Sequence, residues 1–439
     1  MEAGDLSFPS GPPADTYGLT YGIFFLLGAG YLVPWNAFIT AIDYFELLYP
    51  SRHIDYVFSI VYMVPSLICI SLITFFGRRI SATLRVNAGL VMFIIMLIVV
   101  PVMGAVFIKN AKGTEVTYII TVFAAALNGI ADALVQGSIV GSASELPPRF
   151  MQAVMSGGAA SGVLVSILRL ISRAVMPQSQ SGIEASAYLY FIVSTLIMIA
   201  CIICYNLVDK LPVMKYYNKL KISNLDSKNS IHESTYLLES GSLSQENQSP
   251  SKIQAPTDFE AAKDAHETQG TLSQVSLKHV WMKVGWLAVS LCFIYVVTLS
   301  IFPGHITEDL HSSYFGDWYA IILALAYNLF DLIGKFLGGS SRFMILNKAF
   351  AVGGSFARVL FYLLFYLCLH GPNFFQSDAV VIISTSLLGL TNGYLTTILL
   401  IIAPKSVPLE EAEVTAFLMV MFLVVGLAAG SVLEWVWVL

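Results

Sequence analysis

Long apolar segments separated by short polar connections make up most of the chain. Segments long enough to cross a bilayer as a helix, which takes about 20 mostly apolar residues, lie at residues 18–41, 54–77, 86–108, 116–143, 149–175 and 184–208. After a polar interval, similar segments lie at residues 279–303, 317–340, 346–369, 378–403 and 412–437. The pattern therefore predicts eleven transmembrane helices, in a group of six and a group of five.

The composition agrees with a chain that lies in a bilayer. Hydrophobic residues make up 56% of it and charged residues 12%, and the mean hydropathy is +0.75, whereas about a quarter of the residues in soluble domains are charged. We expect an all-α integral membrane protein with the lipid bilayer as its surroundings. The formal net charge of -5 gives no basic field to attract nucleic acid, so nucleic acid is not an expected partner.

The sequence carries no pattern typical of an enzyme or of a metal site. The histidines and cysteines do not have metal-ligand spacing, and a Walker loop, an HExxH motif and a nucleophile elbow are all missing from the sequence. We therefore expect no catalytic residue, no metal and no cofactor.

The distribution of lysine and arginine predicts the orientation. Residues 1–17 lack the basic and apolar regions of a signal peptide, so we expect them to form a cytosolic tail. With that choice, the short inside loops hold seven Lys and Arg residues and the outside loops hold four. Because cytosolic loops carry the excess of positive charge, we expect a cytosolic N-terminus and an extracellular C-terminus.

A long polar segment separates the two groups of helices. Residues 209–278 are rich in Ser, Gln, Glu and Lys and poor in aromatic residues, so they cannot bury enough apolar surface to fold alone. We expect a disordered cytosolic loop between one half at residues 18–208 and another at residues 279–439. Its serines are candidate phosphorylation sites for kinases, although such loops are rich in serine in any case.

The division into six and five helices suggests two halves related by pseudo-symmetry, the plan of a transporter that rocks about a site between its halves. The first helix of each half carries a proline towards its expected outer end: Pro34 in YLVPWNAF and Pro303 in SIFPGHIT. A proline frees a carbonyl group and permits a bend, which predicts gates at these positions. Ordinary tolerance of proline in membrane helices is the alternative.

Two predicted helices carry polar residues along one face. Asn128, Asp132 and Gln136 are spaced by four, and Asn328, Asp331 and Lys335 are spaced by three and four. Ionisable groups cost at least about 2.5 kcal/mol each in a bilayer, so they are candidates for function. Arg169, Arg358 and Asn392 are further polar residues within the apolar segments.

Asp331 and Lys335 have two interpretations. They can form a structural ion pair within one helix, or they can hold a hydroxylated substrate. A carboxylate accepts hydrogen bonds from two adjacent sugar hydroxyls, and an ammonium group donates to a ring oxygen. Gln136 could then bind the edge of a base, and Trp35 could pack on a planar ring, although a Trp near a helix end is often an interfacial anchor.

Six motifs in order resemble the equilibrative nucleoside transporter family. They are LLGAGYLVPWNAFITAIDYF, VQGSIVGSASELP, MQAVMSGGAASG, YNLFDLIGKFL, FARVLF and LTNGYLTTILLIIAPKSV, and they cover nearly the whole chain. The resemblance implies eleven helices with a cytosolic N-terminus, in an arrangement similar to the major facilitator fold. It also implies nucleosides as the substrate.

The resemblance assigns roles to some of these residues. It implies that Gln136, Asn328 and Asp331 contact substrate and that Trp35 and Asn36 lie near the outer gate. Two positions depart from the family pattern and are considered next.

Lys335 stands where the family commonly has arginine, so a bidentate contact is replaced by a point charge. Asp132 stands where other members can have a small uncharged residue. The phrases ADALVQG and RFMQAVMSGGAASGVLVSILR are most similar to plant members, among which proton-coupled uptake is known. Asp132 and Asp331 are therefore candidate proton carriers. Asp132 is preferred, because Lys335 can hold Asp331 in its ionised form.

Together these patterns predict a carrier, not an enzyme. It would move purine and pyrimidine nucleosides, with nucleobases as a further class, by alternating access and proton symport. A passive nucleoside facilitator, another facilitator-type carrier such as a sugar transporter, and a receptor are the alternatives. The plasma membrane is the expected location, and the vacuolar membrane is the alternative.

Overall fold

The computed structural model describes residues 13–50, 52, 54–76, 80–107, 113–177, 179–221, 223, 277–302, 310 and 312–434. Every regular element in this part of the chain is a helix. The long helices are α1 (Leu19–Thr40), α3 (Ile54–Phe76), α4 (Ala82–Phe107), α5 (Glu115–Ser144), α6 (Pro148–Val175), α7 (Gln180–Val208), α10 (Leu277–Leu299), α12 (Tyr319–Gly339), α15 (Asp378–Lys405) and α16 (Leu409–Glu434). With the segment Lys348–His370 they supply eleven helices that are long and apolar enough to cross a membrane within the described residues, which confirms the prediction.

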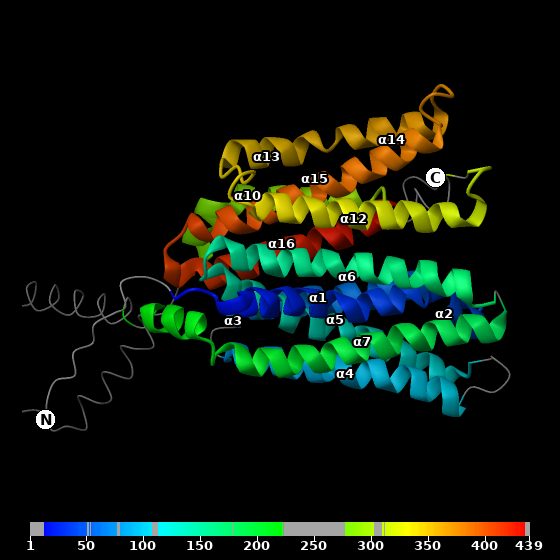
Figure 1. The fold of residues 1–439 in the computed structure, drawn as a ribbon, viewed down its shortest axis with the longest axis horizontal. Coiled ribbons are helices and arrows are strands. Elements are labelled where there is room, and N and C mark those ends of the chain that lie inside the picture. Colours follow the sequence, from blue (N-terminus) through cyan, green and yellow to red (C-terminus); the bar gives the residue numbers. More distant parts are fainter. Residues whose placement is uncertain are drawn as a thin grey trace, which may run out of the picture. The chain divides into compact units, whose positions relative to one another are not determined.

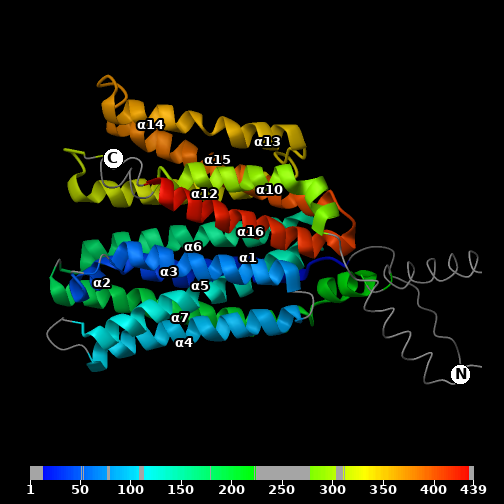
Figure 2. The same cartoon turned by 180° about the vertical axis from the view of Figure 1, so that it is seen from behind.

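The contacts divide the chain into two units, residues 21–207 with 280–439 and residues 1–20 with 208–279. The first unit is the helix bundle shown in Figures 1 and 2. The second unit contains the 3-10 helix η1 (Thr16–Gly18). The Thr20 N–H, just after this helix, donates to the Asp15 carboxylate just before it. Residues 212–221, within the predicted loop 209–278, are helical, and most of the remainder of that loop lies outside the described residues.

The packing of the bundle repeats after six helices. In the first half α5 packs against α3 and α4, and in the second half α15 packs against α12 and α13 (Lys348–Ala357). Between the halves α6 packs against α12, and α16 packs against α3. When the spans are counted in chain order, α5, α3 and α4 are each followed six places later by α15, α12 and α13, and these later helices make the corresponding contacts. The two halves are therefore related by pseudo-symmetry, as the sequence predicts.

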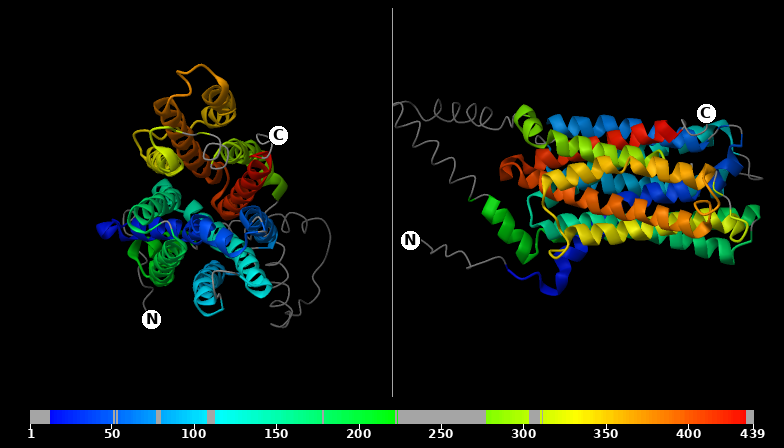
Figure 3. Two further views of the ribbon diagram at one scale, coloured as in Figure 1. Left: turned by 90° about the vertical axis from the view of Figure 1, so that its right-hand side faces the viewer. Right: turned by 90° about the horizontal axis from the view of Figure 1, so that it is seen from above.

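Glycines let α15 approach the backbone of α12. A Cβ atom placed on Gly393 would lie 2.0 Å from the Asp331 carbonyl oxygen, and one on Gly389 would lie 2.4 Å from the Tyr327 carbonyl oxygen. Small residues permit such approaches in membrane proteins. Helix α15 is also the most enclosed of these helices, because 78% of its apolar 18-residue stretch is buried. The end view in Figure 3 shows the helices around it. The backbone around Asp331 is thus packed directly against α15.

Two helices depart from the simple apolar pattern. After α1 the chain turns at Ala41 and forms the short helix α2 (Ile42–Leu48). The ninth span consists of α13 and α14 (Leu360–His370), with Arg358 at the break between them. Pro34 lies inside α1, which continues beyond it to Thr40, and Pro303 lies outside the described residues.

The two ends of the bundle are named here by their connections. Helix α2 lies at one end, the α2 end (Figure 1). The Gly113 N–H donates to the Leu48 carbonyl over 3.1 Å, so α5 begins near this end. The short connection between Ser144 and Pro148 therefore lies at the opposite end, the α5–α6 end.

Candidate functional site

The second half of the bundle contains a buried ion pair on α12. The Lys335 Nζ lies 2.9 Å from Asp331 Oδ2, and the two residues are 6% and 5% exposed. The spacing of four places both side chains on one face of the helix. The Asn392 amide, from α15, donates to Asp331 Oδ1 over 2.8 Å. Both carboxylate oxygens therefore have a partner, and both partners are hydrogen-bond donors.

This ion pair belongs to a longer polar chain. The Thr298 hydroxyl, on α10, lies 3.0 Å from Asn392 Oδ1 and accepts a hydrogen bond of 2.7 Å from Arg358. Arg358 also donates to the Leu388 carbonyl and to Thr391. Its guanidinium is buried at the break between α13 and α14. Four segments of the second half are thus connected through polar side chains that the bilayer would otherwise leave unsatisfied.

The first half presents its own polar face on α5. Asn128, Asp132 and Gln136 are 0%, 4% and 5% exposed. Both polar side-chain atoms of Asn128 and the Oδ1 of Asp132 make no hydrogen bond to any residue that the structure describes. The Tyr62 hydroxyl, on α3, lies within hydrogen-bonding reach of the Asp132 carboxylate. A buried polar atom without a partner costs about 1–3 kcal/mol, so this face is suited to accept a proton, a water molecule or a ligand hydroxyl.

The aromatic residue of the first motif packs directly on this site. The Trp35 ring stacks on the Tyr62 ring with centroids 3.8 Å apart and an angle of 17° between the planes. The next residue, Asn36, donates to the Ser161 hydroxyl of α6 over 2.9 Å. Trp35 therefore connects α1 to the residue that faces Asp132, and Asn36 connects α1 to α6.

Two tyrosines lie between the polar clusters of the two halves. Tyr31, on α1, is close enough to both Asp132 and Asp331 to interact electrostatically with them, and it lies within hydrogen-bonding reach of Gln136. Tyr295, on α10, is within range of Tyr31, Asp331 and Lys335. The sequence analysis missed both, because a tyrosine in an apolar segment fits the hydrophobic pattern. Their shared place in the first helix of each half, in GYLV and IYVV, is the signal that could have found them.

Asn328 bonds to the first half of the bundle. Its amide donates to the Ser166 hydroxyl of α6 over 2.9 Å, and it packs over Gly162 of the same helix. It therefore joins the two halves of the bundle, and no hydrogen bond between Asn328 and Asp331 is present among the described residues.

The model of the nucleoside transporter family matches residues 121–439. This chain belongs to that family. It is 46% identical to equilibrative nucleotide transporter 1 of Arabidopsis thaliana over 97% of its own length and 88% of that protein. It is 38% identical to equilibrative nucleotide transporter 8 of the same plant over 97% of its length and 96% of that protein. The family consists of transporters, so this member is a multi-pass membrane protein that transports and is not an enzyme.

Solved structures share the fold of this nucleoside transporter family member. A proton:xylose symporter of the major facilitator superfamily matches with a TM-score of 0.61 and 12% identity, over 97% of this chain and 89% of that one. The fucose:proton symporter of E. coli matches with a TM-score of 0.57 and 12% identity, over 96% and 91%. The predicted major-facilitator-like arrangement is confirmed at the level of the fold.

A buried ion pair joins the halves of this transporter at the α5–α6 end. Arg85, on α4, donates to Glu413 of α16 over 2.8 Å and to the Ser138 hydroxyl of α5 over 2.9 Å. Its guanidinium lies 5.0 Å from the centre of the Phe417 ring. The two side chains of the pair are 2% and 22% exposed. Arg85 immediately precedes the predicted segment 86–108, but it lies within α4 and connects this helix to α5 and α16.

Proposed function

We propose that this chain carries nucleosides across the membrane by alternating access and that it couples their uptake to a proton. The observation that carries the proposal is the pair of buried polar clusters, one in each half, with Tyr31 and Tyr295 between them. A transporter of this plan holds its substrate between the halves near the middle of the membrane. Membership of the nucleoside transporter family supports nucleosides as the substrate class.

The second-half cluster is suited to the sugar. An incoming ribose would offer two adjacent hydroxyls to the Asp331 carboxylate in place of the Asn392 amide, which occupies one oxygen. Lys335 would remain beside the carboxylate and donate to a base or ring oxygen. Asp331 and Lys335 neutralise each other, and Arg358, in the same polar chain, is engaged with Thr298, Thr391 and the Leu388 carbonyl. The Asp331 carboxylate is therefore the group suited to the hydroxyls of a sugar.

The first-half cluster is suited to the base and to the proton. Gln136 offers both a donor and an acceptor for the edge of a base, near the Tyr31 ring. Asp132 has an oxygen without a partner among the described residues, and burial disfavours a charged carboxylate. It would bind a proton when open to the outside and release it inside. One charge moved through about 100 mV supplies about 2.3 kcal/mol.

The orientation follows from charge. With the N-terminus in the cytosol, the α5–α6 end faces the cytosol and the Arg85–Glu413 pair closes that side. Trp35 and Asn36 then lie towards the outer side. We place the protein in the plasma membrane, with the vacuolar membrane as the alternative. Kinases are the proposed partners of the loop 209–278, whose serines lie mostly outside the described residues.

Transport by the purified full-length protein in liposomes tests this proposal. Radiolabelled uridine should enter, and an acidic outside should drive it above equality with the bath. Asp132→Asn should exchange uridine between loaded compartments but lose both accumulation and stimulation by acid. Glu115→Gln is the control, because Glu115 is an exposed carboxylate paired with Arg52 at the α2 end.

The other outcomes separate the alternatives. Uptake that equilibrates without any dependence on pH would identify a passive facilitator and give Asp132 a structural role. Uptake of radiolabelled glucose together with no uptake of uridine would identify a sugar carrier. Uptake of uridine monophosphate in preference to uridine would show that nucleotides, the substrate class in the relatives' names, describe this chain better.

A further inference from the structure

A groove between α4 and α7 opens on the outside of the first half. Figures 1 and 2 both show these helices side by side along one edge of the bundle. The groove has a volume of about 200 Å³, and its lining includes Leu97 and Val102 of α4 and Phe191 and Leu196 of α7. Val102 and Leu196 are 51% and 62% exposed, so the groove faces the lipid. We propose that it binds a membrane sterol, with the rings between the two helices and the hydroxyl towards the α2 end.

The groove itself offers only hydrocarbon to an occupant. Thr195 is the one polar side chain among the described residues of its lining. Its hydroxyl donates to the Phe191 carbonyl of the same helix over 2.8 Å, so it is already satisfied. Helix α7 has 29 residues and is about 43 Å long, which exceeds the hydrocarbon thickness of about 30 Å. The groove lies near the middle of this helix and therefore in the hydrocarbon region.

Polar side chains gather one turn beyond the groove, towards the α2 end. A Cβ atom placed on Gly104 of α4 would lie against the hydroxyls of both Tyr44 and Tyr188, so these tyrosines meet between α4 and α7. The Tyr44 hydroxyl is within hydrogen-bonding reach of Tyr188, and Tyr188 donates to Glu184 Oε1 over 2.8 Å. Glu184 Oε2 makes no hydrogen bond to any residue that the structure describes. It can therefore accept one from a ligand hydroxyl.

The polar end and the groove lie in one line. Glu184, Tyr188, Ile192 and Leu196 are spaced by four along α7, so they share one face of the helix. From Glu184 to Leu196 the helix rises about 18 Å, whereas one leaflet of the hydrocarbon region is about 15 Å deep. An occupant with its polar group at Glu184 therefore ends near the middle of the bilayer, as a lipid of a single leaflet does.

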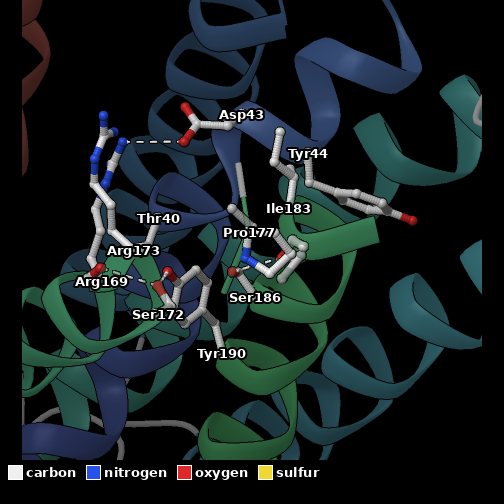
Figure 4. Close-up of a pocket in the computed structure, with 13 residues that line it drawn as sticks. Thr40, Asp43, Tyr44, Arg169, Ser172, Arg173, Pro177, Ile183, Ser186 and Tyr190 are labelled. Carbon is white, nitrogen blue, oxygen red and sulfur yellow. Dashed lines mark hydrogen bonds and ion pairs between the residues drawn. The ribbon is translucent and has the colours of Figure 1, made fainter. Parts of the chain in front are cut away.

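The charge at the polar end favours a neutral hydroxyl over a phosphate. Figure 4 shows Asp43 joined to Arg169 and the Tyr44 ring directed away from that ion pair. Arg169 is thus engaged away from the Tyr44 hydroxyl. A phospholipid would place its phosphate, the group next to its chains, beside the Glu184 carboxylate, and like charges repel. The single hydroxyl of a sterol is uncharged and can donate to that carboxylate.

The walls of the groove suit a rigid ligand. Ile98, Val102 and Ile192 are β-branched, and such side chains have few rotamers. Pro101 and Phe191 add two rings to the same lining. A fused ring system loses little conformational freedom when it binds between such walls, whereas an ordered acyl chain loses the rotations of its single bonds.

Photolabelling of the full-length protein tests the proposal without any nucleoside. The protein is placed in phosphatidylcholine nanodiscs that contain a sterol with a light-activated diazirine on its ring system. Mass spectrometry of the peptides should locate the label at residues 97–102 and 191–196. Unlabelled cholesterol in excess should displace it. Cholesteryl methyl ether, whose oxygen cannot donate a hydrogen bond, should compete about fivefold less well.

Two variants obstruct the groove from opposite walls. Val102→Phe and Ile192→Trp should each lower labelling of these peptides at least about tenfold, and either serves if the other does not fold. Val91→Phe is the matched control, because Val91 is an exposed valine of α4 outside the groove lining. It should be labelled as the wild type is.

A third variant tests the polar end. Glu184→Gln retains an acceptor oxygen but loses the charge, so the affinity for cholesterol should fall about fivefold. Glu115→Gln is its control, because Glu115 is an exposed carboxylate at the same end and is paired with Arg52.

The other outcomes overturn the proposal. Label spread evenly over the lipid-facing helices would show that the groove has no preference for a sterol, as would equal labelling in the wild type, Val102→Phe and Ile192→Trp. Equal competition by cholesterol and its methyl ether would assign the groove to lipid hydrocarbon in general. Because no nucleoside is present, failure of nucleoside transport would leave this result unchanged, and failure here would leave the proposed function standing.

Discussion

The Trp35 indole stacks on the Tyr62 ring at 3.8 Å, and the Tyr62 hydroxyl reaches the Asp132 carboxylate. A residue of the first motif is thereby connected through one ring to a buried acid on α5. If Asp132 carries the proton as proposed above, Tyr62 would link proton binding at Asp132 to movement of Trp35.

Removal of the Tyr62 hydroxyl should change the response of transport to pH. In Tyr62→Phe the ring can still stack, but the ionised Asp132 loses a hydrogen-bond donor, so the carboxylate binds a proton more readily. The pH of half-maximal stimulation of uridine uptake should rise by about one unit, since a hydrogen bond to a charged group contributes about 1.5–3 kcal/mol. Tyr49→Phe is the control, because Tyr49 bonds to Thr121. An unchanged or downward-shifted profile would contradict this link.

Neutralising Asp331 should abolish most transport while the protein still reaches the membrane. In Asp331→Asn an amide replaces the carboxylate that would accept both ribose hydroxyls, and Lys335 is left as a buried cation without its partner. Uridine uptake should fall at least about tenfold, and the discrimination against 2',3'-dideoxy analogues should disappear. Normal uptake with unchanged discrimination would show that the sugar binds elsewhere.

Lys335→Arg should preserve transport or raise the affinity for uridine. Arginine restores the residue implied by the family resemblance and can contact Asp331 through two parallel hydrogen bonds instead of the single 2.9 Å contact of lysine. The concentration dependence of uptake measures the effect. Complete loss of activity in a protein that inserts normally would indicate that Lys335 has a packing or proton-transfer role.

Breaking the Arg85–Glu413 pair should favour opening at the α5–α6 end. In Glu413→Gln the buried Arg85 keeps Ser138 but loses its carboxylate, and breaking such a pair costs several kcal/mol. A cysteine introduced at Ser142 should then react at least about tenfold faster with a membrane-impermeant reagent added from the cytosolic side. Glu115→Gln, which breaks an exposed pair at the other end, should leave the rate unchanged. Equal rates in both variants would refute a closing role.

Deletion of residues 225–270 should leave transport intact and change only abundance or regulation. This stretch lies outside the described residues. A polar segment of this composition is expected to make few favourable contacts with a helix bundle. Uridine turnover per inserted molecule is the measurement. A truncated protein that inserts but no longer transports would mean that the loop couples the two halves.

The sequence predicts the helices well because apolar length alone determines them. Eleven spans, the six-and-five division and the facilitator-like fold all follow from hydropathy and motif order. The break at Arg358 and the short helix α2 do not, since a break depends on hydrogen bonds from other helices, here to Thr298, Thr391 and the Leu388 carbonyl. Arg85 shows the same limit, because its partner Glu413 is distant in sequence.

The candidate site is predictable only in part. Helical spacing places Asp331 with Lys335 and Asp132 with Gln136, because these pairs lie on single helices. It cannot predict that Asn328 bonds to Ser166 on another helix, and it cannot identify Tyr31 and Tyr295, which carry no charge. Packing between helices decides those positions, and hydropathy does not record it.

The enclosure of α15 bears on how the protein responds to its lipids. In α15, 78% of the apolar 18-residue stretch is buried, whereas the corresponding share in Lys348–His370 is 22%. A change in bilayer thickness acts on the helices that touch lipid, so Lys348–His370 will tilt before α15 does. Arg358, at the break within that outer span, donates to α15. A change in membrane thickness can therefore be transmitted to the Asp331 cluster through Arg358, which would make the transport rate sensitive to acyl-chain length.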